Sequence, residues 1–131
     1  MRLLLDTNVV LWSATRDRRL SPQTVELINS RESTVFFSSL STWEIVIKYA
    51  LGYLPLPLEP AEFVPKVIED LKLQTLDITH RHAIEVGRLP MHHRDPFDRM
   101  LVAQARVEEM TLLTSDRNLR KYDVEQFYSR R

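Results

Sequence analysis

Short apolar runs alternate with helix-like patterns along most of this chain. Residues 2–5 (RLLL), 34–38 (TVFFS) and 111–115 (TLLTS) are rich in branched or aromatic side chains, and each is followed by polar or capping residues. Runs of this length and composition predict strands that are buried on both faces. Two weaker patterns predict a short strand at 73–78 and an edge strand at 124–128.

Between the apolar runs, hydrophobic residues recur at the three- and four-residue spacing of amphipathic helices. Ser21 and Pro22 supply the cap and first turn of one helix, and Ser41 with Glu44 has the pattern of a capping box at the start of another. Gly52 and the prolines after it predict an extended connector. The predicted helices span residues 8–15, 22–30, 41–51, 60–71, 79–88 and 97–109. The alternation predicts an α/β fold in which helices cover a central parallel sheet.

The length of the chain suits one domain. It has 131 residues, 44% of them hydrophobic, and no segment has the composition of a linker. We therefore expect residues 1–131 to form a single domain around one core. The first residues, MRLLLDTN, contain only three consecutive leucines, too few for a signal peptide, and no stretch approaches the length needed to span a membrane. These features predict a cytoplasmic protein without a membrane partner.

Composition excludes several kinds of site. Cysteine is absent, so disulfides, thiolate zinc sites and cysteine nucleophiles are excluded, and any metal must be held by oxygen or histidine. The chain has only two glycines, too few for a P-loop or a dinucleotide-binding fingerprint. Its 18 basic and 18 acidic residues balance. If five of the acids, discussed below, belong to one site, the remainder of the protein has 18 basic residues against 13 acidic ones. A neutral total therefore does not exclude RNA or DNA.

Two aspartates come directly after predicted strands. Asp6 follows RLLL, and Asp116 follows TLLTS. In open parallel sheets, ligands usually bind at the carboxyl ends of the strands. Helix capping explains either aspartate taken alone, because an aspartate between a strand and a helix is a favoured N-cap.

Two further acids lie on helix faces that should point toward the core. Glu44 shares a face with Leu40 and Ile47, and Asp98 shares one with Leu101. Burial of an uncompensated carboxylate costs several kcal/mol, so such a group normally has a cationic partner, a metal or a raised pKa. The simplest alternative is that each acid pairs with an arginine.

Asp6, Glu44, Asp98 and Asp116 would repel one another if the fold brought them together. Hard divalent cations such as Mg²⁺ or Mn²⁺ would supply the missing positive charge, since they favour carboxylate oxygen and water. A phosphodiester would then complete the coordination, and the metals would activate a water and stabilise the leaving oxygen. The four acids therefore indicate metal-dependent phosphodiester chemistry.

Short polar residues flank these acids. Asp95 lies one helical turn before Asp98 and would orient a metal-bound water or a ligand, or cap the helix. Thr7, Asn8 and Ser115 would hydrogen-bond to ligands or to the carboxylates, although ordinary capping explains them nearly as well.

Other residues suggest sites but have simpler explanations. His92 and His93 are candidate metal ligands, proton carriers or phosphate contacts, but exposed loop histidines are the better expectation. For Trp12, Trp43 and the aromatic and leucine residues of 49–54, we expect core packing in preference to a partner surface.

The combined pattern resembles a known family. LLLDTN, the glutamate within STWEI, HHRDPFDRMLVAQA and LLTSD occur in an order and spacing similar to those of the PIN-domain ribonucleases, and most of all to the VapC-type toxins. The resemblance covers nearly the whole chain. It implies a three-layer α/β/α sandwich around a parallel sheet, a metal-dependent endoribonuclease site, and inhibition by a small antitoxin encoded beside the toxin. It also implies a homodimer.

The resemblance assigns roles to particular residues. The acidic quartet of the family would be Asp6, Glu44, Asp98 and Asp116, which would hold Mg²⁺ or Mn²⁺ and direct RNA hydrolysis. Asp95 belongs to a DPFD variant seen in one branch of the family. Thr7 or Asn8, and Ser115, would support the metal ligands.

Two other classes of function stay open on the sequence. An aspartate-based phosphatase or phosphotransfer domain would use Asp6 as nucleophile. However, dehalogenase-like phosphatases need a second aspartate where Asn8 stands, and receiver domains need a lysine that TSDRN does not offer. A non-catalytic nucleic-acid-binding or protein-binding module would use the acids only as caps.

Overall fold

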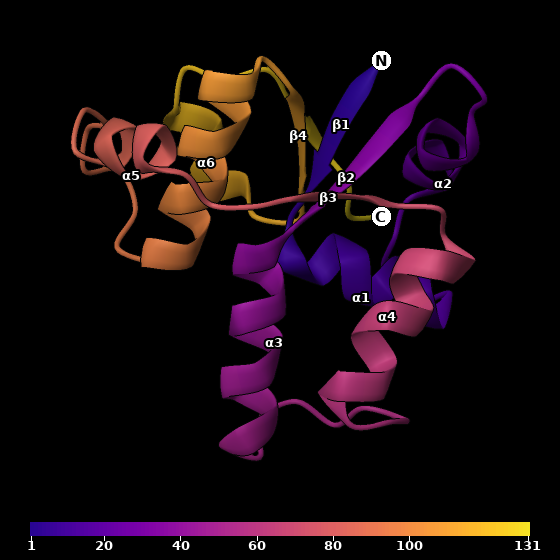
Figure 1. Ribbon diagram of the computed structural model, residues 1–131. Coiled ribbons are helices and arrows are strands. Elements are labelled where there is room, and N and C mark those ends of the chain that lie inside the picture. The colour runs from indigo at the N-terminus through magenta and orange to yellow at the C-terminus, as the bar shows by residue number, and fades with distance from the viewer.

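Five parallel strands form a central sheet in the computed structural model, which describes all 131 residues (Figure 1). The strands are β1 (Arg2–Leu5), β2 (Thr34–Ser38), β3 (Gln74–Leu76), β4 (Thr111–Thr114) and β5 (Gln126–Tyr128), and their order across the sheet is β3-β2-β1-β4-β5. Every neighbouring pair is parallel. The structure confirms all five predicted strands and places the last of them at the edge, as expected.

The central strand β1 explains why its sequence is continuously apolar. Leu3, Leu4 and Leu5 are completely buried. Successive side chains of a strand point to opposite faces. Leu3 and Leu5 accordingly lie in one hydrophobic cluster and Leu4 in a second. Both faces of the sheet are therefore covered, as parallel sheets require.

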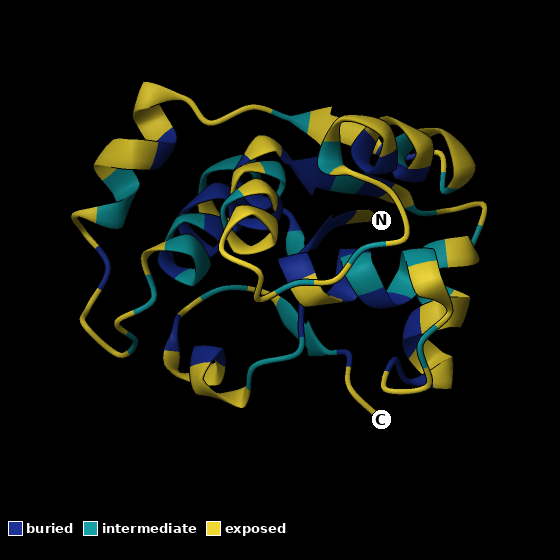
Figure 2. Ribbon diagram, turned by 90° about the horizontal axis from the view of Figure 1, so that it is seen from below, coloured by how far each residue is buried: buried dark blue, intermediate teal, exposed yellow.

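Six helices cover the sheet and complete three layers, which confirms the predicted fold class. They are α1 (Thr7–Thr15), α2 (Pro22–Asn29), α3 (Ser39–Ala50), α4 (Pro60–Asp70), α5 (His80–Val86) and α6 (Pro96–Glu108). The cluster on one face contains residues of α1 and α4, and the cluster on the other contains residues of α6. Figure 1 shows α5 and α6 on one side of the sheet and α2 and α4 on the other, and Figure 2 shows the buried segments gathered between them.

None of the helices combines the length and apolar character that crossing a membrane requires.

The start of α3 differs from the prediction. Its N-cap is Ser38, whose Oγ accepts a hydrogen bond from the backbone N–H of Leu40 at 3.1 Å. The same hydroxyl donates to the buried Gln104 side chain at 2.6 Å. Ser41 lies inside the helix and contacts Thr7, so the predicted capping box is wrong. The tertiary contact with Gln104 favours the earlier serine as the cap.

The exposure of large apolar residues in and just after α3 also differs from the prediction. Trp12 is buried, as expected, but Trp43, Tyr49, Leu51 and Tyr53 are exposed. The expectation of core packing is therefore wrong for these four residues. Figure 1 shows that the last turns of α3 extend past the end of the sheet, which accounts for the exposure of Tyr49, Leu51 and Tyr53. Trp43 lies nearer the start of the helix and packs edge-on against Phe97, with 5.3 Å between the ring centres, but stays more than half exposed.

Replacement of the α3 cap should destabilise the protein. We expect Ser38→Ala to lower the free energy of unfolding by about 2–3 kcal/mol, because it removes a helix cap and leaves the buried Gln104 amide oxygen without its donor. Ser39→Ala is the matched control, since Ser39 is exposed. Urea denaturation of both variants measures the difference. Equal midpoints would contradict the role of Ser38.

Candidate metal centre

Two of the predicted acids lie at the carboxyl ends of adjacent strands. Asp6 follows β1 and caps α1, and Asp116 follows β4 and caps the short 3-10 helix η1 (Arg117–Lys121), which the sequence pattern did not predict. The pairing of β1 with β4 continues into a hydrogen bond from the Asp6 N–H to the Leu113 carbonyl at 2.9 Å. The sheet itself therefore places these two carboxylates at one edge.

The Asp6 carboxylate is buried and held on both oxygens. Oδ1 accepts from the Val9 N–H at 2.8 Å. Oδ2 accepts from the Ser115 N–H at 2.7 Å and from the Ser115 hydroxyl at 3.2 Å. Burial raises the pKa of Asp6, and these hydrogen bonds act in the opposite direction. Ser115 thus has the supporting position that the sequence suggested, while Asn8 donates only a long bond of 3.3 Å to the Ser115 hydroxyl.

Glu44 enters the same region from α3. Its side chain is buried, and its Oε1 accepts a hydrogen bond of 2.6 Å from the Thr7 hydroxyl. Its other oxygen pairs with Lys48 one helical turn later. Burial alone would lower the pKa of Lys48, but the hydrogen bond and charge of Glu44, with smaller effects of Asp95 and Asp98, raise it overall. Glu44 therefore has a lysine partner and a hydroxyl donor in place of the arginine considered from sequence.

Asp98 is repelled by several neighbouring carboxylates. It lies in the first turn of α6. Burial raises its pKa to about 7, with further contributions from the negative charges of Asp95, Asp6 and Glu44, while the hydrogen bond from His93 lowers it. The carboxylates from three different elements are therefore close enough to repel Asp98, as the sequence predicted.

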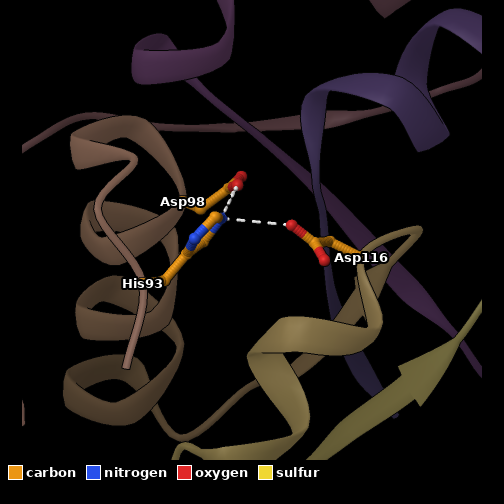
Figure 3. A group of neighbouring side chains, drawn as sticks. All are labelled: His93, Asp98 and Asp116. Atoms are coloured by element: carbon orange, nitrogen blue, oxygen red, sulfur yellow. Dashed lines mark hydrogen bonds and ion pairs between the residues drawn. The ribbon is translucent and has the colours of Figure 1, made fainter. Parts of the chain in front are cut away.

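His93 lies between two of the acids (Figure 3). Its Nε2 is 3.0 Å from Oδ2 of Asp98 and 3.1 Å from Oδ2 of Asp116. The same ring nitrogen thus contacts both carboxylates, and its contact with Asp98 is a hydrogen bond. The side-chain oxygens of Asp98 and Asp116 and a ring nitrogen of His93 all lie within 4.8 Å of one another. The expectation of an uninvolved loop histidine is therefore wrong for His93.

Arg99 fixes the loop that carries His93. Its guanidinium is buried and donates to the Pro90 carbonyl at 3.1 Å and to the Val86 carbonyl at 3.0 Å. The His93 N–H donates to the Tyr122 hydroxyl at 3.1 Å. Arg99 forms no ion pair with a carboxylate. Its guanidinium instead donates to backbone carbonyls, and these bonds hold the loop in the position that brings His93 to the acids.

Asp95 caps α6. Its Oδ1 accepts from the Phe97 N–H at 2.9 Å and from the Asp98 N–H at 3.4 Å. The cap orients the turn that presents Asp98, and the negative charge of Asp95 contributes to the raised pKa of Asp98. The capping alternative is therefore confirmed for Asp95, and its carboxylate also belongs to the electrostatic environment of the site.

Sequence reasoning missed one partner and undervalued another. Lys48 was not among the candidates, although its position four residues after Glu44 is the helical spacing of an ion pair. His93 was named, but no local pattern distinguishes it from His92, whose ring instead packs edge-on against Tyr122. Only the fold of the loop decides which of the two faces the acids.

The donor set fits a hard divalent cation. Carboxylate oxygens dominate the cluster, with one imidazole nitrogen and no sulfur. Mg²⁺ and Mn²⁺ prefer such ligands, and a dication would offset the repulsion that raises the pKa of Asp98. The arrangement has the charge that would bind a cation and the strand-end position at which a substrate could reach it.

Comparison with known families agrees with this geometry. The family model described as PIN domain matches residues 3–125. The chain belongs to the PIN domain family. Over 60 residues it is 32% identical to Ribonuclease VapC16 of Mycobacterium tuberculosis, a match that covers 46% of this chain and 43% of that protein. The alignment thus spans less than half the length of this curated relative.

Solved structures share the fold at low sequence identity. The chain is similar to one in the crystal structure of VapBC2 from Rickettsia felis bound to a DNA fragment from their promoter, with a TM-score of 0.74 and 16% identity over 97% of this chain and 98% of that one. It is also similar to a chain of FitAcB from Neisseria gonorrhoeae, with a TM-score of 0.67 and 21% identity over 95% and 96% of the two chains. These likenesses show the PIN-like sandwich.

Removal of the Asp98 charge should stabilise the metal-free protein above neutral pH. The pKa of Asp98 is about 7 in the folded protein and near 4 in the unfolded chain. Between pH 4 and pH 7 the folded state therefore binds more protons than the unfolded state, so the free energy of unfolding falls as the pH rises through this range. We expect Asp98→Asn in EDTA to raise the melting temperature at pH 8 more than at pH 5. Calorimetry at pH 5 and pH 8 measures the two melting temperatures. An equal rise in melting temperature at both pH values would contradict the repulsion of Asp98 by its neighbours.

Proposed function

We propose that residues 1–131 act as a single PIN-like domain that hydrolyses RNA phosphodiester bonds with Mg²⁺ or Mn²⁺. One observation carries this proposal: Asp98 and Asp116 meet at the same ring nitrogen of His93, at 3.0 and 3.1 Å. The charges of Asp6 and Glu44 also act on Asp98. Membership of the PIN domain family and the likeness to Ribonuclease VapC16 support RNA as the substrate.

Asp6, Asp98 and Asp116 would hold the cation, and Glu44 would complete the site or position a water. A bound Mg²⁺ or Mn²⁺ supplies an activated water and stabilises the oxygen that leaves in the displacement. His93 lies against two of these proposed ligands and would orient them.

The surrounding residues would keep the carboxylates in place before substrate arrives. Ser115 and the start of α1 hold both oxygens of Asp6. Thr7 and Lys48 do the same for Glu44. Such preorganisation means that little rearrangement is needed when a cation and a phosphate enter.

The partners follow from the same proposal. The similarity of the sequence to VapC-type toxins supports a role as the toxin of a toxin-antitoxin pair, with a cognate antitoxin as inhibitor and a homodimer as the working unit. The fold neighbours from VapBC2 and FitAcB structures support this assignment. We place the protein in the cytoplasm on the same grounds.

Capping alone does not account for the acids. Asp6, Asp95 and Asp116 each cap a helix, but Glu44 and Asp98 cap none. A module that used acids only as caps would have no reason to bury Glu44 or to leave Asp98 repelled by its neighbours. This favours the metal-dependent nuclease over the non-catalytic alternative.

Cleavage of a defined structured RNA tests the proposal. With Mn²⁺, we expect Asp98→Asn to lower the cleavage rate by about 100-fold or more. Loss of a residue that binds the metal directly should exceed the roughly 10–100-fold effect of replacing a residue that only contacts a metal ligand. Asp77→Asn is the matched control, since Asp77 also follows a strand but is exposed. Gel analysis of purified proteins measures the rates. Full activity of wild type in excess EDTA would refute the proposal.

Metal binding can be measured without activity. At an Mn²⁺ concentration 100 times its Kd, we expect wild type to gain about 2.7 kcal/mol of stability. The gain should be smaller at pH 6 than at pH 8, because a proton on Asp98 competes with the cation. Thermal shift assays with Asp116→Asn and Asp77→Asn compare a proposed ligand with a control. An unchanged gain in Asp116→Asn would remove Asp116 from the site.

A further inference from the structure

Arginines and aromatic residues follow the last segment of the chain away from Asp116. Arg117 comes directly after Asp116, and its guanidinium lies 4.8 Å from the centre of the Tyr128 ring. Two residues beyond Tyr128, the Arg130 guanidinium lies 5.7 Å from the centre of the Trp12 ring. The Arg19 guanidinium lies 4.9 Å from the same ring. We call Arg117, Tyr128, Arg130, Trp12 and Arg19 the arginine track.

The far end of the track is strongly basic. The turn after α1 meets the end of the chain there, because the Arg131 N–H donates to the Arg19 carbonyl at 2.6 Å. Arg16, Arg18, Arg19, Arg130 and Arg131 are all exposed in this region. Asp17 pairs with Arg19 at 2.8 Å. The other four arginines form no ion pair, and the second acid of this region, Asp70, pairs with Lys66.

The near end of the track opens into a small hollow beside the acids. The hollow has a volume of about 170 Å³, and its lining combines one proposed metal ligand with polar, basic and aromatic side chains: Thr114, Asp116, Arg117, Arg120, Gln126 and Tyr128. This volume is below the roughly 300 Å³ at which drug-sized pockets begin, so it suits one base or one phosphate. Because Asp116 belongs to both the hollow and the acidic centre, such a group would lie beside a proposed metal ligand.

The chemistry of the track matches a nucleic-acid backbone. A guanidinium on an aromatic face is held in a defined plane and keeps N–H edges free for bidentate contacts with phosphate. Proteins that bind single-stranded nucleic acids combine positive charge with aromatic platforms, on which bases stack. Tyr128 is half-buried and offers such a platform, whereas Trp12 is buried and serves as a support.

The position of the arginine track would offset the repulsion between substrate phosphates and the acidic centre. The acidic centre would repel the phosphates of a substrate, and the lysine within it is already paired with Glu44. Positive charge along the approach would offset this repulsion and steer the substrate. Although the whole chain has a net charge of zero, Arg117 and Arg130 of the track and the neighbouring Arg16, Arg18 and Arg131 form no ion pair.

We propose that the arginine track binds the RNA backbone on one side of the bond to be cut, with the hollow beside Asp116 taking a base or phosphate. The choice of RNA as the ligand rests on the ribonuclease function proposed above. An acidic protein segment is the other class of partner that arginines attract. The aromatic platform and the place of Asp116 in both the hollow and the acidic centre favour RNA.

The test is RNA binding by a double variant, Arg117→Ala with Arg130→Ala. The matched control is Arg31→Ala with Arg88→Ala, which removes two exposed arginines outside the track. Fluorescence anisotropy with a labelled structured RNA in EDTA measures affinity without cleavage. We expect the track variant to bind at least about tenfold more weakly, and its salt slope to fall by about 2, one for each lost phosphate contact. The control should match wild type.

Two further measurements separate charge from folding. Melting temperatures identify any loss of fold. Arg117→Lys with Arg130→Lys should keep most of the salt slope, because the charges stay, yet bind more weakly than wild type, because the planar stack is lost. A track variant that is folded and binds RNA as well as the control would overturn the proposal. Loss of poly-glutamate binding alone, with RNA binding intact, would assign the surface to an acidic protein.

The same proteins distinguish this inference from the proposed function. If wild type cleaves RNA with Mn²⁺ but the track variant binds RNA normally, the track is refuted and the nuclease stands. If wild type binds RNA through the track but no Mn²⁺-dependent cleavage occurs, the nuclease is refuted and the track stands.

Discussion

Repulsion among carboxylates is the constraint on which the rest of the structure depends. Asp98 lies close enough to Asp95, Asp6 and Glu44 for their charges to raise its pKa. The free energy to hold such groups together must come from elsewhere, and here it comes from the sheet and the two hydrophobic clusters on its faces. Because the adjacent strands β1 and β4 lead into Asp6 and Asp116, the sheet holds these two carboxylates at one edge.

The same acids also stabilise local structure, which reconciles their two explanations. Asp6, Asp95 and Asp116 each accept backbone N–H groups at a helix start. A cap fixes the position of its carboxylate as firmly as it fixes the helix, so a capping aspartate at the end of a strand is already oriented for a ligand. Capping and metal binding are therefore compatible uses of one side chain.

Charges of opposite sign are separated in space although they balance in number. Asp98 and Asp116 meet near the carboxyl end of β4, whereas Arg130 and Arg131 lie at the end of the chain and Arg16 and Arg18 in the turn after α1. Net charge sums over the whole surface and so hides this separation, whereas a phosphate near the protein responds to the local field. A neutral composition is thus consistent with binding of a polyanion.

The sequence by itself determined the layers and most of the acidic centre. Continuous apolar runs predicted the three central strands, because a parallel strand buried on both faces must be apolar throughout, and weaker patterns predicted the two edge strands. Acids on core-facing helix positions revealed Glu44 and Asp98. Tertiary structure decided what local pattern does not contain. It chose Ser38 over Ser41 as the α3 cap through Gln104, and turned His93 and not His92 toward the acids through a loop held by Arg99. It also left Tyr49 exposed where α3 extends past the sheet. The physical reason is that each of these choices depends on contacts between residues far apart in the chain, while propensity and periodicity report only on near neighbours.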